Sequence, residues 1–299
     1  DTSDIVTKEM YTFVTKGGDE ITLRPENTAG VARAFISEGL AQATPLKFFY
    51  AGPMFRHERP QKGRQRQFHQ IGVEIIGVAT PQADIEVIAA GARVLSELGL
   101  GGKTSLQLNT LGDPESRAAY REALILYFTD RVNELSTESR DRLGRNPLRI
   151  IDSKNEGDQT IVSGAPTFSD FLNEHSREFF AEVKDGLDML GIPYVLNERL
   201  VRGLDYYGHT AFEFTTSDLG AQDAVLAGGR YDGLIETMGG PNTPGVGWAA
   251  GIERLAMMID DPEEGARPIA VIPIGEEAQS QALVITQKLR QSGFCVELS

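Results

Sequence analysis

The segment KFFYAGPMFRHERPQKGRQRQFHQIGVEIIG, residues 47–77, contains two strand-like runs joined by a basic loop. The runs, residues 47–56 and 67–77, are rich in the aromatic and β-branched residues that favour strands. The loop between them is basic, with a single glutamate, Glu58, among its charges. Its basic residues are Arg56, Arg59, Lys62, Arg64 and Arg66. The pattern predicts two paired strands that carry a cationic loop.

The second run alternates with a period of two, as a half-buried strand does. One face carries His69, Ile71, Val73 and Ile75, and the opposite face carries Phe68, Gln70, Gly72 and Glu74. The Ile/Val face requires a core, so Gln70 and Glu74 are expected on the opposite face, with Gly72 leaving space between them. The residues alone leave open whether this polar face lines a ligand site or is a solvated sheet face.

Upstream of these strands, residues 11–23 alternate polar and apolar residues around Gly17-Gly18, which predicts a hairpin. The segment LRPENTAGVARAFIS at 23–37 follows. Its Pro25 and Asn27 precede an Ala-rich stretch with helical spacing, so Glu26 and Thr28 are expected at or near a helix start.

Downstream, an amphipathic helix containing Ile85 to Leu95 ends at Gly99, and TSLQLNT at 104–110 predicts another strand. Residues 113–191 are mostly helical in pattern and charged. We interpret them as a helical insertion between two halves of a β-rich domain, because strand patterns return after Tyr194. Residues 261–268 have linker composition. A single strand–helix–strand unit follows, which is too small to be stable alone, so the C-terminal end is expected to be incomplete. The sequence does not begin with Met, so the N-terminal end is expected to be incomplete too.

The composition is that of a soluble globular protein of two or three domains, with 40% hydrophobic and 24% charged residues among 299. No apolar run approaches the roughly 20 residues of a membrane span, and no signal peptide is present at the start, which favours the cytoplasm. A net charge of −14 argues against non-specific wrapping of nucleic acid. The cationic loop instead indicates a confined polyanion, such as a nucleoside triphosphate or one end of an RNA, although a solvated charged turn is the ordinary alternative.

Cysteine and histidine usage argues against a protein metal centre. Cys295 is the single cysteine, which excludes an intrachain disulfide and a cysteine-based zinc site. The four histidines show no metal-ligand spacing. No metal-ligating residues are therefore predicted.

Two glycine-punctuated segments, LVRGLDYY at 200–207 and AGGRYDGL at 227–234, combine Arg, Asp and Tyr. That composition suits a buried polar pocket for a small ligand better than a hydrophobic core, because glycine allows close backbone approach while the polar groups fix orientation. The tyrosines could also be core residues with satisfied hydroxyls, and the aspartates could be buried structural partners.

Five segments in order, TLRPENTA at 22–29, the motif at 55–77, LVRGLDYY, AGGRYDGL and GVGWAAGIERL at 245–255, resemble the histidyl-tRNA synthetase family of class II aminoacyl-tRNA synthetases. The resemblance covers essentially the whole chain, and the ordered combination is specific. It implies an α+β fold with an antiparallel sheet flanked by helices, a helical insertion and a partial α/β C-terminal domain.

The resemblance also implies the role of each charged residue at the ATP site. Arg56 would bind the ATP α-phosphate and the histidine carboxylate, Glu58 would lie by the adenine, and Arg254 would reach the γ-phosphate. Arg64 is the candidate for the β- or γ-phosphate or for the tRNA acceptor end. Arg202 would face Arg56 across the α-phosphate, where some other class II enzymes hold a metal ion.

A neutral imidazole has one N–H donor and one acceptor, so a selective pocket requires a carboxylate and a hydroxyl or similar group. Glu74 and Tyr207 resemble the pair that serves this purpose in the family. Tyr231 would close the pocket. By the same resemblance, the residues that hold the α-amino group would be Glu26, Thr28 and Gln70.

The resemblance implies four parts: a first catalytic segment at 1–112, a helical insertion at 113–191, a second catalytic segment at 192–262 and an incomplete anticodon-binding domain at 268–299. The implied ligands are L-histidine, ATP with Mg²⁺ bound through its phosphates, and the tRNA for histidine, with a homodimer as the full-length assembly. The alternative is a non-catalytic paralogue, the regulatory subunit of ATP phosphoribosyltransferase. The presence of the site residues argues against that alternative, because the paralogue generally lacks them.

Overall fold

The structure is a computed structural model that describes residues 9–200, 206–220, 224–260 and 267–299. The chain divides into two compact units, Asp1–Ile259 and Asp260–Ser299. None of the helices in the described ranges combines the length and apolarity that a membrane crossing requires.

The larger unit is built on a seven-stranded sheet with the strand order β3-β4-β9-β8-β7-β5-β6. All neighbouring strands are antiparallel except β5 and β6, which confirms the predicted antiparallel sheet. The strands are β3 (Leu46–Phe55), β4 (Gln67–Ile76), β5 (Ser105–Thr110), β6 (Tyr194–Leu196), β7 (Gly208–Thr215), β8 (Ala224–Arg230) and β9 (Gly245–Gly251).

Strands β3 and β4 pair over their full length, from Leu46 opposite Ile76 to Phe55 opposite Gln67. The basic residues 56–66 form the loop between them, as predicted. On its other side β4 pairs with β9, which sets Glu74 opposite Gly247. A glycine opposite this glutamate leaves the space that the carboxylate occupies.

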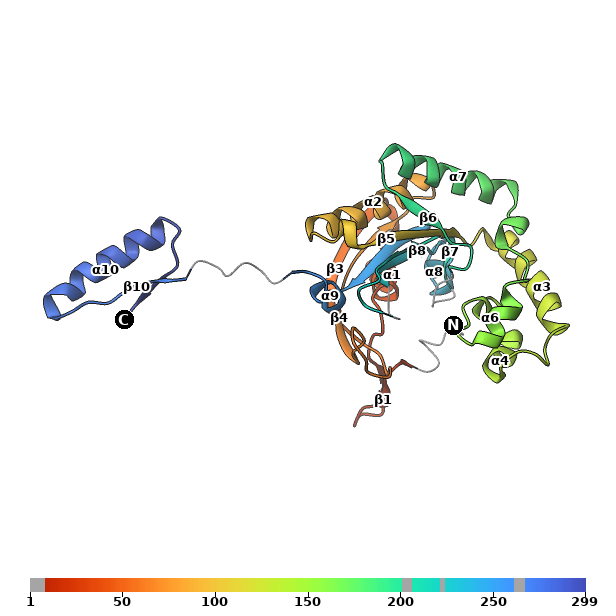
Figure 1. The fold of residues 1–299 in the computed structure, drawn as a ribbon, viewed down its shortest axis with the longest axis horizontal. Helices are drawn as coiled ribbons and strands as arrows, with labels where there is room; N and C mark the ends of the chain where they lie inside the picture. Colours follow the sequence, from red (N-terminus) through yellow and green to blue (C-terminus); the bar gives the residue numbers. More distant parts are fainter. Residues whose placement is uncertain (1–8, 201–205, 221–223, 261–266) are drawn as a thin grey trace. The chain divides into compact units, whose positions relative to one another are not determined.

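The two faces of the sheet have separate apolar cores. On one face α2 (Pro81–Glu97) and α7 (Glu174–Met189) lie side by side (Figure 1), and their apolar residues pack with Ile75, Phe212 and Trp248. The other face is covered by α1 (Thr28–Ser37) and the short α8 (Leu234–Thr237), whose apolar residues pack with the opposite side of β4 and β7. The predicted alternation of β4 is therefore confirmed.

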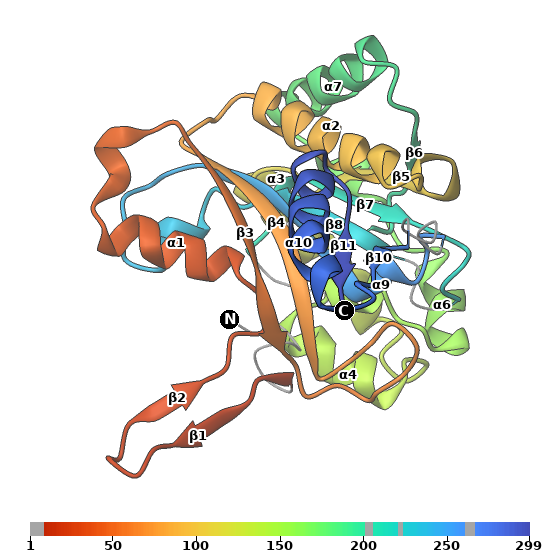
Figure 2. The same ribbon diagram turned by 90° about the vertical axis from the view of Figure 1, so that its left-hand side faces the viewer.

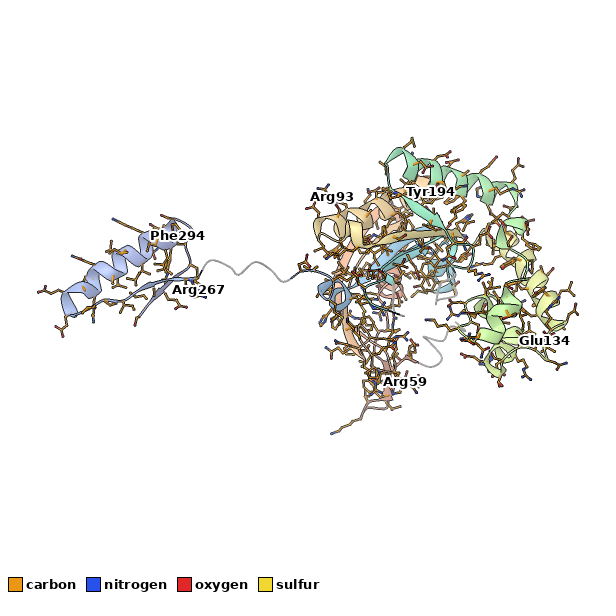
Figure 3. All side chains as sticks on the ribbon, viewed as in Figure 1. Arg59, Arg93, Glu134, Tyr194, Arg267 and Phe294 are labelled. Atoms are coloured by element: carbon orange, nitrogen blue, oxygen red, sulfur yellow. The ribbon has the colours of Figure 1, made fainter. Side chains whose placement is uncertain are left out.

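Helices between β5 and β6 form a third, separate core. These helices are α3 (Pro114–Thr129), α4 (Thr137–Arg145), α5 (Leu148–Ile151) and α6 (Glu156–Val162), with a 3₁₀ turn at Phe168–Phe171. The long helix α7 differs from them, because its apolar residues join the core of the sheet rather than this third core. In Figure 3, Glu134 marks the turn between α3 and α4. The assignment of residues 113–191 as one insertion domain stays a prediction.

Side-chain caps fix where these helices begin. Asp113 accepts a hydrogen bond from Ser116 N at the start of α3, and Asn173 accepts one from Ser176 N at the start of α7. Asn173 Nδ2 also donates to Asp113 Oδ2 at 2.7 Å, so the two caps bond to each other. These N-terminal caps tie the separate helical core to the edge of the sheet.

A hairpin, a short helix and two 3₁₀ turns are further elements of the larger unit. Strands β1 (Thr12–Val14) and β2 (Glu20–Thr22) form the predicted antiparallel hairpin, which projects away from the sheet (Figure 2). Helix α9 (Ile252–Ala256) follows β9 directly. Two further 3₁₀ turns cover Leu40–Ala43 and Gly101–Lys103.

The second unit, considered by itself, contains β10 (Ile269–Val271), α10 (Glu276–Gln291) and β11 (Val296–Leu298). The two strands are parallel, so the predicted strand–helix–strand unit is confirmed. Cys295 is exposed.

Candidate active site

A cavity of about 470 Å³ opens between α1, the loop after β3, and the strands β4, β7, β8 and β9. Eight residues predicted from the sequence line it, although the chain places them in five separate segments. They are Glu26, Thr28, Arg56, Glu58, Arg64, Gln70, Tyr207 and Arg254. Arg202, which was also predicted for the phosphate side, lies outside the described residues.

The first wall of the cavity is the start of α1, where the sequence predicted it. The Glu26 carboxylate accepts hydrogen bonds from the backbone N–H groups of Thr28 and Ala29. These N–H groups have no partner within the helix, so the carboxylate takes the place of a capping side chain. Burial raises the pKa of Glu26, while the two backbone hydrogen bonds and the charge of Arg56 oppose the rise.

Glu74 and Tyr231 lie behind the cavity wall rather than in it. Glu74 is 1% exposed and accepts hydrogen bonds from Thr28 Oγ1 at 2.7 Å and from the Tyr231 hydroxyl at 2.7 Å. Thr28 lines the cavity and thereby connects Glu74 to it. Burial raises the pKa of Glu74 to about 8, although both hydrogen bonds act in the opposite direction. The buried carboxyl group is therefore largely neutral at pH 7.

The raised pKa of Glu74 predicts a pH-dependent stability. Between its ordinary pKa of 4.5 and the folded value of about 8, the folded chain binds more protons at this site than the unfolded chain. The contribution of Glu74 to the free energy of unfolding should therefore fall as pH rises from 5 to 8. The Glu74→Gln variant should lack this decline. Urea titrations of the wild type and of Glu74→Gln between pH 5 and 8 will measure the free energy of unfolding. Glu86→Gln, at an exposed position, is the control and should retain the wild-type dependence of this free energy on pH.

Gly247 provides the space beside Glu74. A Cβ atom there would overlap Glu74 Oε2 and the Val73 carbonyl oxygen, whereas a Cβ at Gly251 on the same strand would meet only Arg254 side-chain atoms, at 3.8 Å or more. We expect Gly247→Ala to displace the Glu74 carboxyl and to weaken histidine binding at least about tenfold, as overpacking of a closed site does. Calorimetric titration with histidine will measure the affinity. An unchanged affinity in Gly247→Ala would separate Glu74 from histidine binding. The control Gly102→Ala, where an added Cβ has nothing within 4 Å, should keep the wild-type affinity.

The polar half of the cavity is the part lined by Glu26, Thr28 and Gln70. Gln70 gives the most direct indication that this half binds a ligand. Its side chain is 8% exposed and lines the cavity, and its Oε1 atom has no hydrogen-bond partner among the described residues. An unpartnered buried carbonyl oxygen is costly, so it favours a ligand that donates N–H groups. The Tyr206 hydroxyl, also in the cavity wall, likewise has no described partner.

The other half of the cavity is lined by Arg56, Glu58, Arg64 and Arg254. Nearby acceptors hold its arginines in place. Arg56 donates from Nε to the Pro25 carbonyl oxygen at 2.8 Å, and its guanidinium lies 5.1 Å from the centre of the Phe68 ring. Glu58, 8% exposed, pairs with Arg64 and lies 3.9 Å from Arg56 NH1. The loop therefore concentrates two guanidinium groups around one buried carboxylate.

Arg254 joins the strand β9 to this loop. The strand runs directly into α9, as the sequence predicted, and Arg254 Nε donates to the Gly63 carbonyl oxygen at 2.8 Å. Its NH1 donates to the Ala224 carbonyl oxygen at 2.6 Å. Gly63 has a φ of +72°, a conformation that favours glycine at the turn of the loop.

Arg230, in the segment AGGRYDGL, belongs to the framework of the site. Its fully buried guanidinium forms a two-pronged ion pair with Asp84 and donates to Asp232 Oδ1 at 3.0 Å. Asp232 also accepts from Gly245 N at 3.1 Å. Asp232 therefore has the structural role that sequence reasoning left open, and Asp205 lies outside the described residues.

Sequence reasoning missed several residues of the cavity wall, and some of them carry a charged or hydroxyl group. They include Glu9, Arg149, Tyr206 and Glu213. Glu213 could have been found, because it alternates with Phe212 and Phe214, whose face is the apolar core. Arg149 had no such signal, since it lies on a four-residue helix of the separate helical core. Among the described residues, no group of three or more His, Cys, Asp or Glu side chains is arranged to hold a metal ion.

Comparisons with known proteins identify the family of the chain. The family described as tRNA synthetase class II core domain (G, H, P, S and T) matches residues 11–258. The histidine–tRNA ligase of Rhodospirillum rubrum is 63% identical over 99% of this chain and 72% of its own length. That of Gluconacetobacter diazotrophicus is 57% identical over 100% of this chain and 72% of its own length.

Solved structures show the same fold. The apo histidyl-tRNA synthetase of S. aureus superposes with a TM-score of 0.78 at 37% identity, over 99% of this chain and 73% of that one. A structure described as an ATP phosphoribosyltransferase regulatory subunit/histidyl-tRNA synthetase from Bacillus halodurans is 23% identical, with a TM-score of 0.67 over 99% and 79% of the chains, and shows the fold alone. The identities of 57–63% to histidine–tRNA ligases therefore decide between the two readings of the sequence. The chain belongs to the class II aminoacyl-tRNA synthetases and, within them, to the histidine–tRNA ligase family.

Proposed function

We propose that the cavity activates L-histidine with ATP, forming histidyl-adenylate and pyrophosphate, and that histidine then passes to the 3′ end of its tRNA. One observation carries the proposal. A single cavity holds several arginines beside a buried, unpartnered Gln70 oxygen and the carboxylate of Glu26. Arginines match the phosphates of ATP, and the polar half matches an amino acid with an ammonium group.

In the adenylation step, a carboxylate oxygen of histidine attacks the α-phosphorus of ATP while the bond to pyrophosphate breaks. The amino acid carboxylate is already ionised at neutral pH, so the step needs no protein base. The proposed work of the protein is to hold the reactants in line and to stabilise negative charge at the α-phosphate. We assign this charge stabilisation to Arg56 and, on sequence grounds, to Arg202.

We assign histidine recognition to the polar half of the cavity. Gln70, Thr28 and Glu26 would receive the α-amino group. The side chains proposed for the imidazole are Tyr207 in the wall and Glu74 behind it, with Tyr231 closing the site. The hydrogen bonds that Glu74 accepts from Thr28 and Tyr231 support this assignment, because they hold both carboxyl oxygens in place behind the cavity wall.

The remaining arginines are assigned to the distal phosphates: Arg64 to the β- or γ-phosphate or the tRNA acceptor end, and Arg254 to the γ-phosphate. Glu58 is assigned to the adenine. When bound with ATP, Mg²⁺ would neutralise part of the phosphate charge.

Three further parts of the proposal rest on the family. They are recognition of the tRNA for histidine, a homodimer in the full-length protein and a cytoplasmic location. The cationic loop at 56–66 supports the first, because it sets five basic residues on a chain with a net charge of −14.

The test is histidine-dependent exchange of pyrophosphate into ATP with Mg²⁺, with other amino acids as controls. Exchange with histidine alone is expected. Binding of histidine without exchange would contradict the adenylation proposal and would favour a non-catalytic role. Charging of the tRNA for histidine by the full-length protein is the second expected result.

A further inference from the structure

The helical core between β5 and β6 reaches the cavity through one arginine among its described residues. Arg149 lies on α5 and is part of the cavity wall. Its neighbours Ile150 and Ile151 are buried, at 0% and 8% exposed, in the separate helical core. With its two neighbours anchored in that core, the Arg149 side chain extends from the helical core into the site.

Two contacts fix α5 and its surroundings. Arg142 of α4 donates from NH1 to the Arg149 carbonyl oxygen at 3.3 Å, which ties α5 to the preceding helix. Arg117 of α3 donates to the backbone carbonyl oxygen of Tyr207, a residue of the cavity wall. The helical core is therefore bonded to the wall of the site as well as contributing Arg149 to it.

One contact of the Arg149 guanidinium is with Asp152, at the end of α5. Its NH1 lies 3.6 Å from Asp152 Oδ2, beyond a good hydrogen bond, and the Asp152 side chain is 51% exposed while that of Arg149 is 19% exposed. An ion pair of this kind contributes little, because solvent screens the exposed partner.

We propose that Arg149 is a phosphate-binding residue of the active site, supplied by the helical core; the assignment rests on the proposed function. A guanidinium presents paired N–H donors that match phosphate oxygens. Two sources share this chemistry in the proposed reaction: the triphosphate of ATP, and the last phosphodiesters of the tRNA acceptor end. In either case Arg149 couples the position of the helical core to the occupancy of the site.

The test compares Arg149→Ala with Arg149→Lys and with Arg145→Ala, a control that removes an exposed arginine of α4. Affinity for ATP with Mg²⁺ is measured by calorimetry, and affinity for tRNA by filter binding. Arg149→Ala should lower at least one affinity about tenfold or more, and Arg149→Lys should restore part of it by retaining the charge. Loss of ATP affinity alone identifies the triphosphate, and loss of tRNA affinity alone identifies the acceptor end.

Affinities for both ligands within twofold of wild type would overturn the proposal, and Arg149 would then be a structural ion-pair residue. Both measurements are binding measurements, so they do not depend on turnover. A wild-type protein that fails to exchange pyrophosphate would refute the proposed function, while the two affinities would still decide the role of Arg149.

Discussion

Replacement of Arg56 by alanine is expected to reduce histidine-dependent pyrophosphate exchange about 10³-fold. Arg56 is positioned by its hydrogen bond to the Pro25 carbonyl oxygen and by the Phe68 ring, so its guanidinium is fixed before any ligand binds. Loss of one prearranged donor to developing negative charge costs about 10²–10³ in rate, and Arg56 is also proposed to hold the histidine carboxylate. The measurement is the rate of exchange at saturating ATP and histidine.

The matched control for this prediction is Arg59→Ala. Arg59 belongs to the same loop but is exposed and lies outside the cavity wall (Figure 3), and the exchange reaction contains no tRNA for it to contact. Exchange by Arg59→Ala should remain within twofold of wild type. An Arg56→Ala protein that is folded and retains exchange within tenfold of wild type would remove Arg56 from the adenylation step.

Replacement of Asp84 by asparagine is expected to destabilise the larger unit by about 3–5 kcal/mol, because it leaves the buried Arg230 guanidinium without its main counter-charge. Both side chains of the pair are 0% exposed. The free energy of unfolding is measured by urea titration. Fluorescence of Trp248, the single tryptophan of the chain, reports on this unit. Its side chain is 3% exposed, and its indole N–H donates to the Val87 carbonyl oxygen on the helix that carries Asp84.

Two further variants test the cause of this loss. The double variant Asp84→Asn/Arg230→Met removes both charges and should recover part of the lost stability, because replacing a whole buried ion pair costs less than breaking it. Glu86→Gln alters an exposed ion pair on the same helix and should change stability by less than about 1 kcal/mol. Equal losses for Asp84→Asn and the double variant would point to packing rather than charge as the cause.

The local pattern of the chain predicted much of the sheet and of the cavity wall. The alternation in β4 placed Gln70 and Glu74 on one face, and the polar start of α1 placed Glu26 and Thr28 at its first turn. Both predictions depend on neighbours within a few residues, where side-chain direction follows from backbone periodicity. The roles given to these residues came from the family resemblance and stay predictions until the binding and exchange measurements are made.

The connections behind the site were not predictable in the same way. Glu74 accepts hydrogen bonds from Thr28 and Tyr231, which lie 46 and 157 positions away along the chain. Arg230 pairs with the carboxylate of Asp84, which lies 146 positions away. Arg149 carries no local pattern that marks it as a residue of the cavity, because only the packing of its two isoleucine neighbours directs it there.

The sequence by itself determined the elements, their polar and apolar faces and the family, because these depend on residue order and periodicity. Only the tertiary structure decided which polar groups meet, that Glu74 lies behind the wall with a raised pKa, and that the helical core contributes Arg149. The physical reason is that burial and charge pairing depend on distances in space, which the packing of distant segments sets and local sequence does not encode.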